Sequence, residues 1–212
     1  MIYEGTLAKM DSELGNPIQY YLVFDTNFLN MNQLLGKKIS IDFVGYQCLN
    51  CKKNKKIFRQ GFCYECFYSS PQVGDWIMRP ELSTAHLGIQ DRDLAYEQKV
   101  QLQPHVVYLA ASSEVKVGVT RKTQVPTRWI DQGASQALVV LEVPNRYLAG
   151  ITEVALKDHF VDKTNWRKML QNDTITVELS DLKANLKQYI PQEALPYFSE
   201  SISQSYQLDY PV

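Results

Sequence analysis

Four cysteines form two Cys-x-x-Cys pairs early in the chain, and no other cysteine occurs in it. The pairs are Cys48 with Cys51 and Cys63 with Cys66, and residues 52–62 separate them. Two residues between paired cysteines let both thiolates reach one ion from a tight turn, and two such turns complete a tetrahedral site of four sulfur ligands. A redox motif would not occur twice, and disulfides are uncommon in a reducing compartment. The spacing therefore predicts a zinc ribbon that holds a structural Zn²⁺.

The loop between the two cysteine pairs is basic and is interleaved with the aromatic residues Phe58, Phe62 and Tyr64. Lysine and arginine attract phosphate, and aromatic rings stack on bases, so this loop could lie along a nucleic-acid backbone. The alternative is a solvated loop whose aromatic side chains pack on the ribbon. The candidate nucleic-acid-binding residues of the loop are Lys52, Lys53, Lys55, Lys56 and Arg59.

A second group of polar residues lies among short apolar runs between residues 105 and 169. Residues 106–109 and 115–119 are rich in β-branched and aromatic side chains, which predicts the two strands of a hairpin. Pro126 is expected in the first turn of a short helix, where its missing N–H costs nothing, and Gly133 is expected to end that helix.

A later helix is predicted from about residue 152 to residue 160. Thr152 is its expected N-cap. Glu153 would then lie in the first turn, where the helix dipole favours a carboxylate. The hairpin and the two helices are the elements that must position any reactive side chains in this region.

Taken in order, these residues resemble the motifs of the GIY-YIG nuclease superfamily. Val106-Val107-Tyr108 matches the first motif in its tyrosine, and Lys116-Val117-Gly118 matches the second in its glycine, with lysine at the tyrosine position. Arg128 corresponds to the arginine of the family's helix, Glu153 to its metal-binding glutamate and Asn165 to its asparagine. The resemblance implies an α+β domain with a small antiparallel sheet and flanking helices.

The resemblance also implies a divalent-metal-dependent nuclease or phosphodiesterase that acts on DNA or RNA. Glu153 would hold Mg²⁺ or Mn²⁺, Arg128 would bind a phosphate oxygen, and Tyr108 would be, or would orient, the general base. Lys116 would supply the positive charge that a tyrosine of pKa about 10 needs in order to act near neutral pH. Asn165 would brace the loop or the substrate. We therefore expect the catalytic residues to converge on one open groove beside the hairpin.

Arg121 and Lys122 follow the glycine of the second motif and are expected to contact flanking phosphates. Each catalytic candidate also has a structural interpretation, with Tyr108 as a packed strand residue, Arg128 as a surface charge and Glu153 as a capping carboxylate. Two alternatives to a nuclease therefore remain. One is a zinc-ribbon nucleic-acid-binding protein without catalysis, and the other is a zinc-stabilised scaffold for protein interactions.

The whole-chain composition is that of an ordinary folded protein, with 45% hydrophobic and 21% charged residues over 212 positions. The net charge of −1 means that any nucleic-acid surface must be a local patch. We see no apolar run of the ~18 residues that a membrane helix needs, and no signal-peptide pattern, so the expected location is the cytoplasm. Residues 48–169 also look like a zinc-ribbon-bearing bacterial family known only as a domain of unknown function.

The sequence predicts three regions. Residues 2–46 alternate in the manner of an antiparallel sheet. Its strands are expected near residues 5–10, 18–24 and 38–44. The regions are a β-rich N-terminal part over 1–104 with the ribbon at about 45–70, a GIY-YIG-like domain over 105–171, and a C-terminal extension over 172–212 that packs on the body. Within the extension, a strand is expected at 174–179 and a helix at 182–189.

Overall fold

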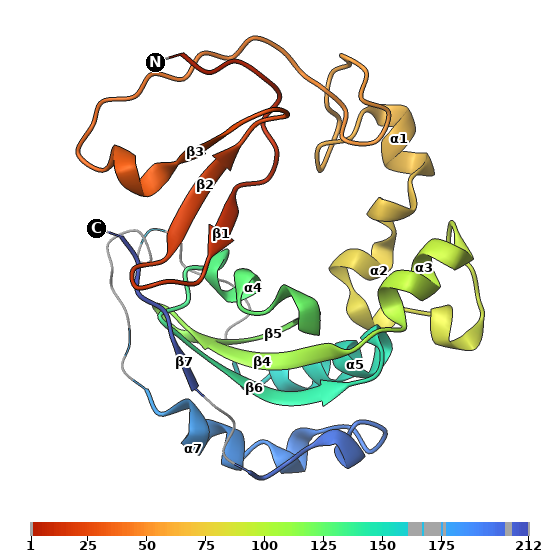
Figure 1. Ribbon diagram of the computed structural model, residues 1–212. Helices are drawn as coiled ribbons and strands as arrows, with labels where there is room; N and C mark the ends of the chain where they lie inside the picture. Colours follow the sequence, from red (N-terminus) through yellow and green to blue (C-terminus); the bar gives the residue numbers. More distant parts are fainter. Residues whose placement is uncertain (1, 161–166, 168–174, 176, 202–204, 212) are drawn as a thin grey trace. The chain divides into compact units, whose positions relative to one another are not determined.

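The computed structural model describes residues 2–160, 167, 175, 177–201 and 205–211, so the predicted site residue Asn165 lies outside the described residues. The chain divides into two compact units (Figure 1). The first contains Met1–Gly74 and Asp209–Val212, and the second contains Asp75–Leu208. The boundary expected at residues 104 and 105 therefore falls inside the second unit. Small antiparallel sheets combined with helices confirm the predicted α+β class.

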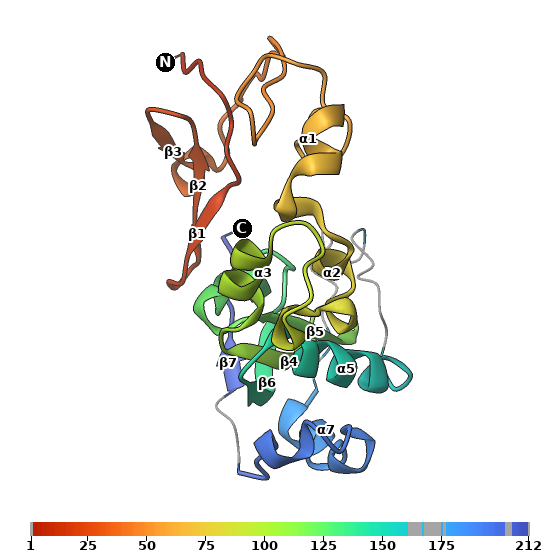
Figure 2. The same ribbon diagram turned by 90° about the vertical axis from the view of Figure 1, so that its right-hand side faces the viewer.

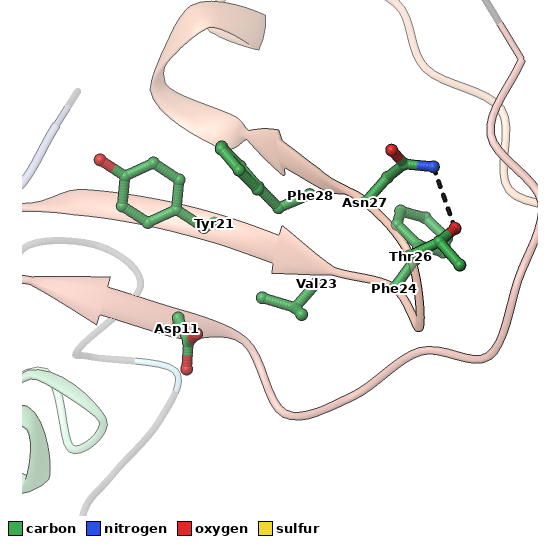
Figure 3. Close-up of a pocket in the computed structure, with 7 residues that line it drawn as sticks. All are labelled: Asp11, Tyr21, Val23, Phe24, Thr26, Asn27 and Phe28. Carbon is green, nitrogen blue, oxygen red and sulfur yellow. Dashed lines mark hydrogen bonds between the residues drawn. The ribbon is translucent and has the colours of Figure 1, made fainter.

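The first unit contains a three-stranded antiparallel sheet in the order β1-β2-β3. Its strands are β1 (Asp11–Glu13), β2 (Gln19–Val23) and β3 (Phe28–Asn30), and the 3₁₀ helix η1 (Met31–Leu34) follows them. A tight link joins β2 to β3, where the Phe24 amide donates to the Asn27 carbonyl at 2.7 Å. Beside this link lies an open hollow of ≈ 490 Å³, lined by side chains of β2 and β3 and by Asp11 (Figure 3).

Two of the three strands predicted in this sheet are wrong in position. The run at residues 5–10 contributes a single bridge, between Leu7 and Phe24, and the strand begins only at Asp11. Residues 38–44 are not a strand, and the partner of β2 is instead β3, four residues further along the chain. A partner this close in sequence needs only a short loop to be closed, which costs less entropy than a distant one.

The rest of the first unit is the cysteine-containing segment and the helix that follows it. Helix α1 (Tyr64–Ser69) begins directly after Cys63, and the 3₁₀ helix η2 (Pro71–Val73) begins after Ser70, whose hydroxyl accepts from the Gln72 amide at 3.3 Å. The four cysteines form a small core with Phe62 and Val73. The ribbon segment is therefore held together by its own side chains.

The second unit is built on a four-stranded antiparallel sheet in the order β5-β4-β6-β7. The strands are β4 (His105–Ala111), β5 (Val115–Arg121), β6 (Gln136–Val143) and β7 (Ser205–Gln207). The predicted hairpin is confirmed, with β4 and β5 joined through residues 112–114. Every residue of β4 is buried, as expected for an interior strand of apolar composition.

The helices of this unit flank the sheet on both sides, with α4 on one face and α5 on the other (Figures 1 and 2). Among the described residues, no helix is long and apolar enough to cross a lipid bilayer. The α-helices are α2 (Asp75–Met78), α3 (Leu94–Gln101), α4 (Thr127–Ile130), α5 (Arg146–Lys157) and α7 (Leu179–Ala184). The 3₁₀ helices are η3 (Pro80–Leu82), η4 (Ala85–Leu87), η5 (Lys122–Gln124), η6 (Lys187–Tyr189) and η7 (Leu195–Tyr197).

The start predicted for helix α5 is wrong by about two turns. The helix begins at Arg146, and its N-cap is Asn145, whose side chain accepts from the Leu148 amide at 2.9 Å. Thr152 lies inside the helix, where its hydroxyl donates to the Leu148 carbonyl at 2.7 Å. Helix α5 continues through Gly150. A side chain at this position would collide with the backbone of Pro80 and Glu81. Glycine is needed for this close packing of α5 on η3.

Other elements of the second unit were missed or misplaced by the sequence. The strand expected at 174–179 is not formed by its described residues 175, 177 and 178, and α7 begins at Leu179. Strands β6 and β7 were not anticipated. In β6 the pairing with β4 shifts between Val107 and Tyr108, which leaves Val140 as an extra residue. Leu138 and Leu141 both reach the core because of this bulge, so β6 lacks the strict alternation that identifies a strand.

Candidate active site and cysteine cluster

The β4–β5 hairpin places two of the predicted site residues on one face of the sheet. Tyr108 pairs with Gly118, and Ala110 pairs with Lys116. Directly paired residues of antiparallel strands point to the same side. Tyr108 and Lys116 therefore share the face opposite the apolar cluster that contains Val107 and Leu109.

Gly118 is required by the position of the Tyr108 ring. A Cβ atom at residue 118 would lie 2.6 Å from Cζ and from the hydroxyl oxygen of Tyr108. Because these atoms belong to a ring that is packed on all sides, the tyrosine could not move aside. The glycine of the second motif thus makes room for the tyrosine of the first.

Tyr108 is fully buried, and its hydroxyl donates to Oε1 of Gln132 at 2.9 Å. Its ring meets Trp129 of α4 edge to face, with the ring centres 5.9 Å apart. Burial raises the pKa of Tyr108 to about 12, although the nearby charge of Arg128 and a hydrogen bond to Arg128 act in the opposite direction. A phenol with this pKa holds its proton at neutral pH, in keeping with its donation to Gln132.

Arg128 and Lys116 lie close to this tyrosine but differ in exposure. Arg128 is exposed on α4 and is hydrogen-bonded to Tyr108. Lys116 is only 8% exposed. Burial, together with the charge of Arg128, lowers the pKa of Lys116, which makes the neutral amine more accessible than in a solvated lysine.

Glu153 projects from the second half of α5 with its side chain only 13% exposed. Its Oε1 lies 3.9 Å from Nζ of Lys157, one helical turn further on. The charge of Glu153 also acts on Tyr108 and on Arg146. Electrostatic interactions therefore connect Tyr108 with Arg128 and Glu153, and Lys116 with Arg128, and we call these residues and their charged neighbours the cluster.

Arg146 is a member of this cluster that the sequence did not identify. Its guanidinium donates to the carbonyls of Trp76 at 3.1 Å and Ile77 at 2.8 Å, and it lies 5.6 Å from the centre of the Trp76 ring. Burial lowers the pKa of Arg146 to about 10, with Glu153 acting in the opposite direction. Arg146 and Glu153 are two helical turns apart and so share a face of α5. This spacing would have been the signal, had the helix start been placed correctly.

The cluster carries more positive than negative charge. Its permanent cations are Arg121, Arg128 and Arg146, its carboxylates are Glu81 and Glu153, and Lys116 is an amine of lowered pKa. The field of Arg146 and Arg121, added to burial, lowers the pKa of His105 to about 4, so this histidine adds no charge at neutral pH. An excess of fixed cations around a recessed carboxylate favours an anionic ligand such as phosphate.

The two basic residues predicted beside the hairpin are engaged with neighbours. Arg121 donates through Nε to Oε1 of Gln124 at 3.2 Å, and Lys122 forms an exposed ion pair with Glu142 at 2.8 Å. In the ribbon loop, Lys55 pairs with Glu65 at 2.6 Å, whereas Lys52, Lys53, Lys56 and Arg59 are exposed. The predicted basic residues therefore differ in how readily a phosphate could reach them.

The cysteine cluster has the geometry expected for a metal site. The four Sγ atoms all lie within 4.8 Å of one another, and this group could hold a metal ion such as zinc. Cys48 accepts from the backbone amide of Cys63 at 3.3 Å, and Cys66 accepts from the side-chain amide of Asn50 at 3.4 Å. Burial alone would raise the pKa of Cys48, but hydrogen bonds from surrounding backbone amides lower it to about 6.

The turns that carry the cysteines require an unusual backbone conformation at two neighbouring residues. Lys52 and Gly61 both adopt positive φ, of 58° and 82°, which is strained for lysine and easy for glycine. A side chain at residue 61 would displace the exposed Leu49 side chain, so the positive φ is the stronger reason for glycine there. The ribbon predicted from the cysteine spacing is consistent with this arrangement.

No curated protein and no solved structure matches the chain. A family model described as "Protein of unknown function (DUF2797)" matches residues 36–212, which include the cysteine cluster and the whole second unit. The chain therefore belongs to the DUF2797 family of proteins of unknown function.

Proposed function

We propose that the second unit hydrolyses phosphodiester bonds in nucleic acid. The observation that carries this proposal is that Tyr108 and Lys116 share one face of the β4–β5 hairpin beside Arg128, with the charge of Glu153 acting on Tyr108. Catalysis of this reaction depends chiefly on groups that stabilise the charge developing on phosphate. Arg128 is the exposed cation of the cluster and would bind a phosphate oxygen.

Lys116 is the better candidate for the general base. Tyr108 has a pKa of about 12 and holds its proton, whereas the pKa of Lys116 is lowered by burial and by Arg128. The oxygen of a water molecule would attack phosphorus while its proton passes to neutral Nζ of Lys116. The bond from phosphorus to the leaving sugar oxygen would break, and that oxygen would take a proton from solvent. Tyr108 would position the base and Arg128 through its hydroxyl.

Glu153 would hold a divalent ion such as Mg²⁺ or Mn²⁺, which offsets charge on the phosphate. Among the described residues this cluster offers one well-placed carboxylate with several cations around it, so it is not a preformed metal cage. Mg²⁺ commonly binds through one or two carboxylates together with substrate phosphates. We therefore expect the ion to bind Glu153 only together with the substrate.

The ion of the cysteine cluster is proposed to be Zn²⁺, because four thiolates in tetrahedral reach are its usual structural ligands. All four cysteines serve as ligands, so no position is left open for substrate. The zinc would stabilise the ribbon and take no part in the reaction.

The test is cleavage of labelled single-stranded DNA, duplex DNA and RNA in the presence of Mg²⁺ or Mn²⁺. Glu153→Gln should lower the rate by at least about 10²-fold, the typical loss when one group that stabilises a transition state is removed. Arg128→Ala should weaken both binding and cleavage. Glu193→Gln, the same change at an exposed glutamate of this unit, is the control and should leave the rate unchanged.

Lys116→Arg separates the role of base from that of fixed charge, because arginine keeps the charge but cannot lose its proton. Loss of cleavage in this variant, with nucleic-acid binding retained, supports the base assignment. The nuclease proposal is abandoned if the wild type cleaves none of the three substrates with either ion. It is equally abandoned if Glu153→Gln cleaves as fast as the wild type.

A non-catalytic nucleic-acid-binding protein is the second candidate. The exposed basic residues of the ribbon loop favour it, because they lie outside the unit that carries the cluster. Binding without cleavage in the experiment above would support this alternative.

A further inference from the structure

Four aromatic side chains pack together on the cysteine ribbon, three of them exposed and Phe67 partly buried against the cysteine core, and we call them the aromatic cluster. They are Phe58, Tyr64, Phe67 and Tyr68, and neighbouring ring centres are 4.9 to 6.1 Å apart. Tyr64 is 62% exposed, Tyr68 57% and Phe58 42%. Single exposed apolar residues are common on proteins, but a contiguous patch of them usually marks a binding site.

The aromatic cluster is held in place by the fold of the ribbon. Tyr64, Phe67 and Tyr68 are spaced i, i+3 and i+4 on α1, so they share one face of that helix. Phe58 is fixed from the other side, since its amide donates to the Phe62 carbonyl at 2.7 Å and Phe62 is buried among the cysteines. Rings that are already ordered lose little conformational entropy when a ligand stacks on them.

The surroundings of the aromatic cluster are positively charged. The guanidinium of Arg59 lies 5.4 Å from the centre of the Phe58 ring, and Lys52, Lys53 and Lys56 are exposed in the same loop. The carboxylate of Glu65 is neutralised by Lys55 at 2.6 Å. Lysine is depleted in the cores of protein interfaces, whereas stacked rings beside lysine and arginine are what nucleic-acid sites use. The charge thus favours nucleic acid over a protein partner.

We propose that the aromatic cluster binds single-stranded nucleic acid by stacking on unpaired bases, with Lys52, Lys56 and Arg59 contacting the phosphates. In a duplex the faces of the bases are covered by their neighbours, so only an unpaired strand can offer them to tyrosine rings. The inference rests on the proposed function for the choice of nucleic acid as ligand and deepens it by naming the strand type.

The experiment measures binding of labelled oligo-dT and oligo-U, and of a duplex of equal length, to the full chain carrying Glu153→Gln, without added divalent ion, so that cleavage is minimised. Single strands should bind more tightly than the duplex. Tyr64→Ala and Tyr68→Ala should each raise the Kd for single strands by roughly 5- to 150-fold, the range for loss of one stacked base. Tyr64→Phe and Tyr68→Phe keep the ring and should retain the affinity.

Tyr197→Ala removes an exposed tyrosine of the second unit and is the matched control, which should leave the Kd unchanged. Metal content of each variant shows that the ribbon remains folded. The inference is overturned if the duplex binds with the same Kd as single strands. It is also overturned if neither alanine substitution raises the Kd for single strands. A cluster that binds apolar peptides but no oligonucleotide overturns it as well, since the surface would then be a protein-docking site.

The two proposals fail in different ways. A wild-type chain that binds single strands through Tyr64 and Tyr68 but cleaves nothing removes the nuclease and leaves the stacking site. If the chain cleaves nucleic acid but the tyrosine variants leave the Kd unchanged, the stacking site is excluded and the nuclease proposal stands.

Discussion

The cysteine ribbon and the candidate active site are assembled in different ways. Within the ribbon, all four sulfur atoms come from residues 48–66, and their spacing alone brings them together. The cluster of the candidate active site draws instead on β4, β5, α4 and α5, and Arg146 of that cluster is held by carbonyls some seventy residues earlier in the chain. A site built from local turns can be read from sequence, whereas a site built from packed elements depends on where those elements begin and end.

Removing the metal should have the largest effect, and it should be confined to the ribbon. We expect about one zinc per chain, because four thiolates are a complete ligand set. Structural zinc contributes about 10–16 kcal/mol of apparent binding free energy in isolated zinc-finger peptides. Cys63→Ser or a strong chelator should therefore unfold the ribbon, while the second unit keeps its structure. Elemental analysis and hydrogen exchange of the backbone amides measure the two effects.

The exposed loop residue Asn54 supplies the control, since Asn54→Ser should keep both the zinc and the amide protection. The contrast between the two regions breaks down if loss of the metal also exposes the amides of β4. Zinc well below one per chain in the wild type, with the thiols joined in disulfides, would contradict the assignment itself.

Among the single substitutions in the second unit, Gly150→Val should cause the largest loss of stability. The new side chain would meet the backbone of Pro80 and Glu81, which cannot move as a side chain could, so α5 must shift away from η3. Overpacking of this kind typically costs about 1–3 kcal/mol of stability. Since α5 carries both Arg146 and Glu153, cleavage should fall as well. Urea unfolding followed by fluorescence of Trp76 and Trp129 measures the loss, because both tryptophans are buried in this unit.

Gly45→Ala is the matched control for this change. A methyl group at residue 45 would have no other atom within 4 Å, so the alanine should be accepted without loss of stability. Unaltered stability of Gly150→Val would mean that α5 does not pack closely on η3.

The outcome for α5 shows where sequence reasoning succeeded and where it failed. The hairpin and the cysteine turns follow from residues that are neighbours in sequence, whereas helix α4 ends at Ile130, before the predicted end at Gly133. The predicted start of helix α5 is too late because it treats Thr152 as the N-cap, whereas the hydroxyl of Thr152 donates to the Leu148 carbonyl inside the helix. Strand β6 was missed because a bulge opposite Tyr108 removes its alternation. Arg146 was overlooked because the helix was predicted to begin after it, so its position on the same helical face as Glu153 was not seen.

His105 should make the stability of the second unit depend on pH. Burial and the nearby arginines lower its pKa to about 4, against about 6.5 in an unfolded chain. Between these values the unfolded chain binds more protons, so stability rises with pH there. The contribution is fully present above pH 6.5 and is lost as the pH falls toward 4. The shift corresponds to about 3 kcal/mol at most.

Unfolding free energies at pH 7 and pH 4.5 test this linkage. His105→Asn keeps a donor that could replace the hydrogen bond of Nδ1 with the Gln103 carbonyl, at 2.7 Å in the wild type, but does not titrate. The variant should lose less stability than the wild type on acidification. Identical losses in the two proteins would show that His105 is not the group responsible.

The smallest expected effect compares one lysine from each region. Lys56 is exposed in the ribbon loop, so Lys56→Gln should lower the slope of log Kd against log salt by about 0.7 for single strands. Lys122 is paired with Glu142 at 2.8 Å, and a phosphate would have to compete with that carboxylate. Lys122→Gln should therefore change the slope by less.

An exposed ion pair such as Lys122–Glu142 contributes only about 0–1 kcal/mol, so one substitution can remove its competition with phosphate without unfolding the protein. Glu142→Gln should release Lys122 and increase the slope. If Lys122→Gln lowers the slope as much as Lys56→Gln does, the ion pair does not shield Lys122, and the two regions bind phosphate alike.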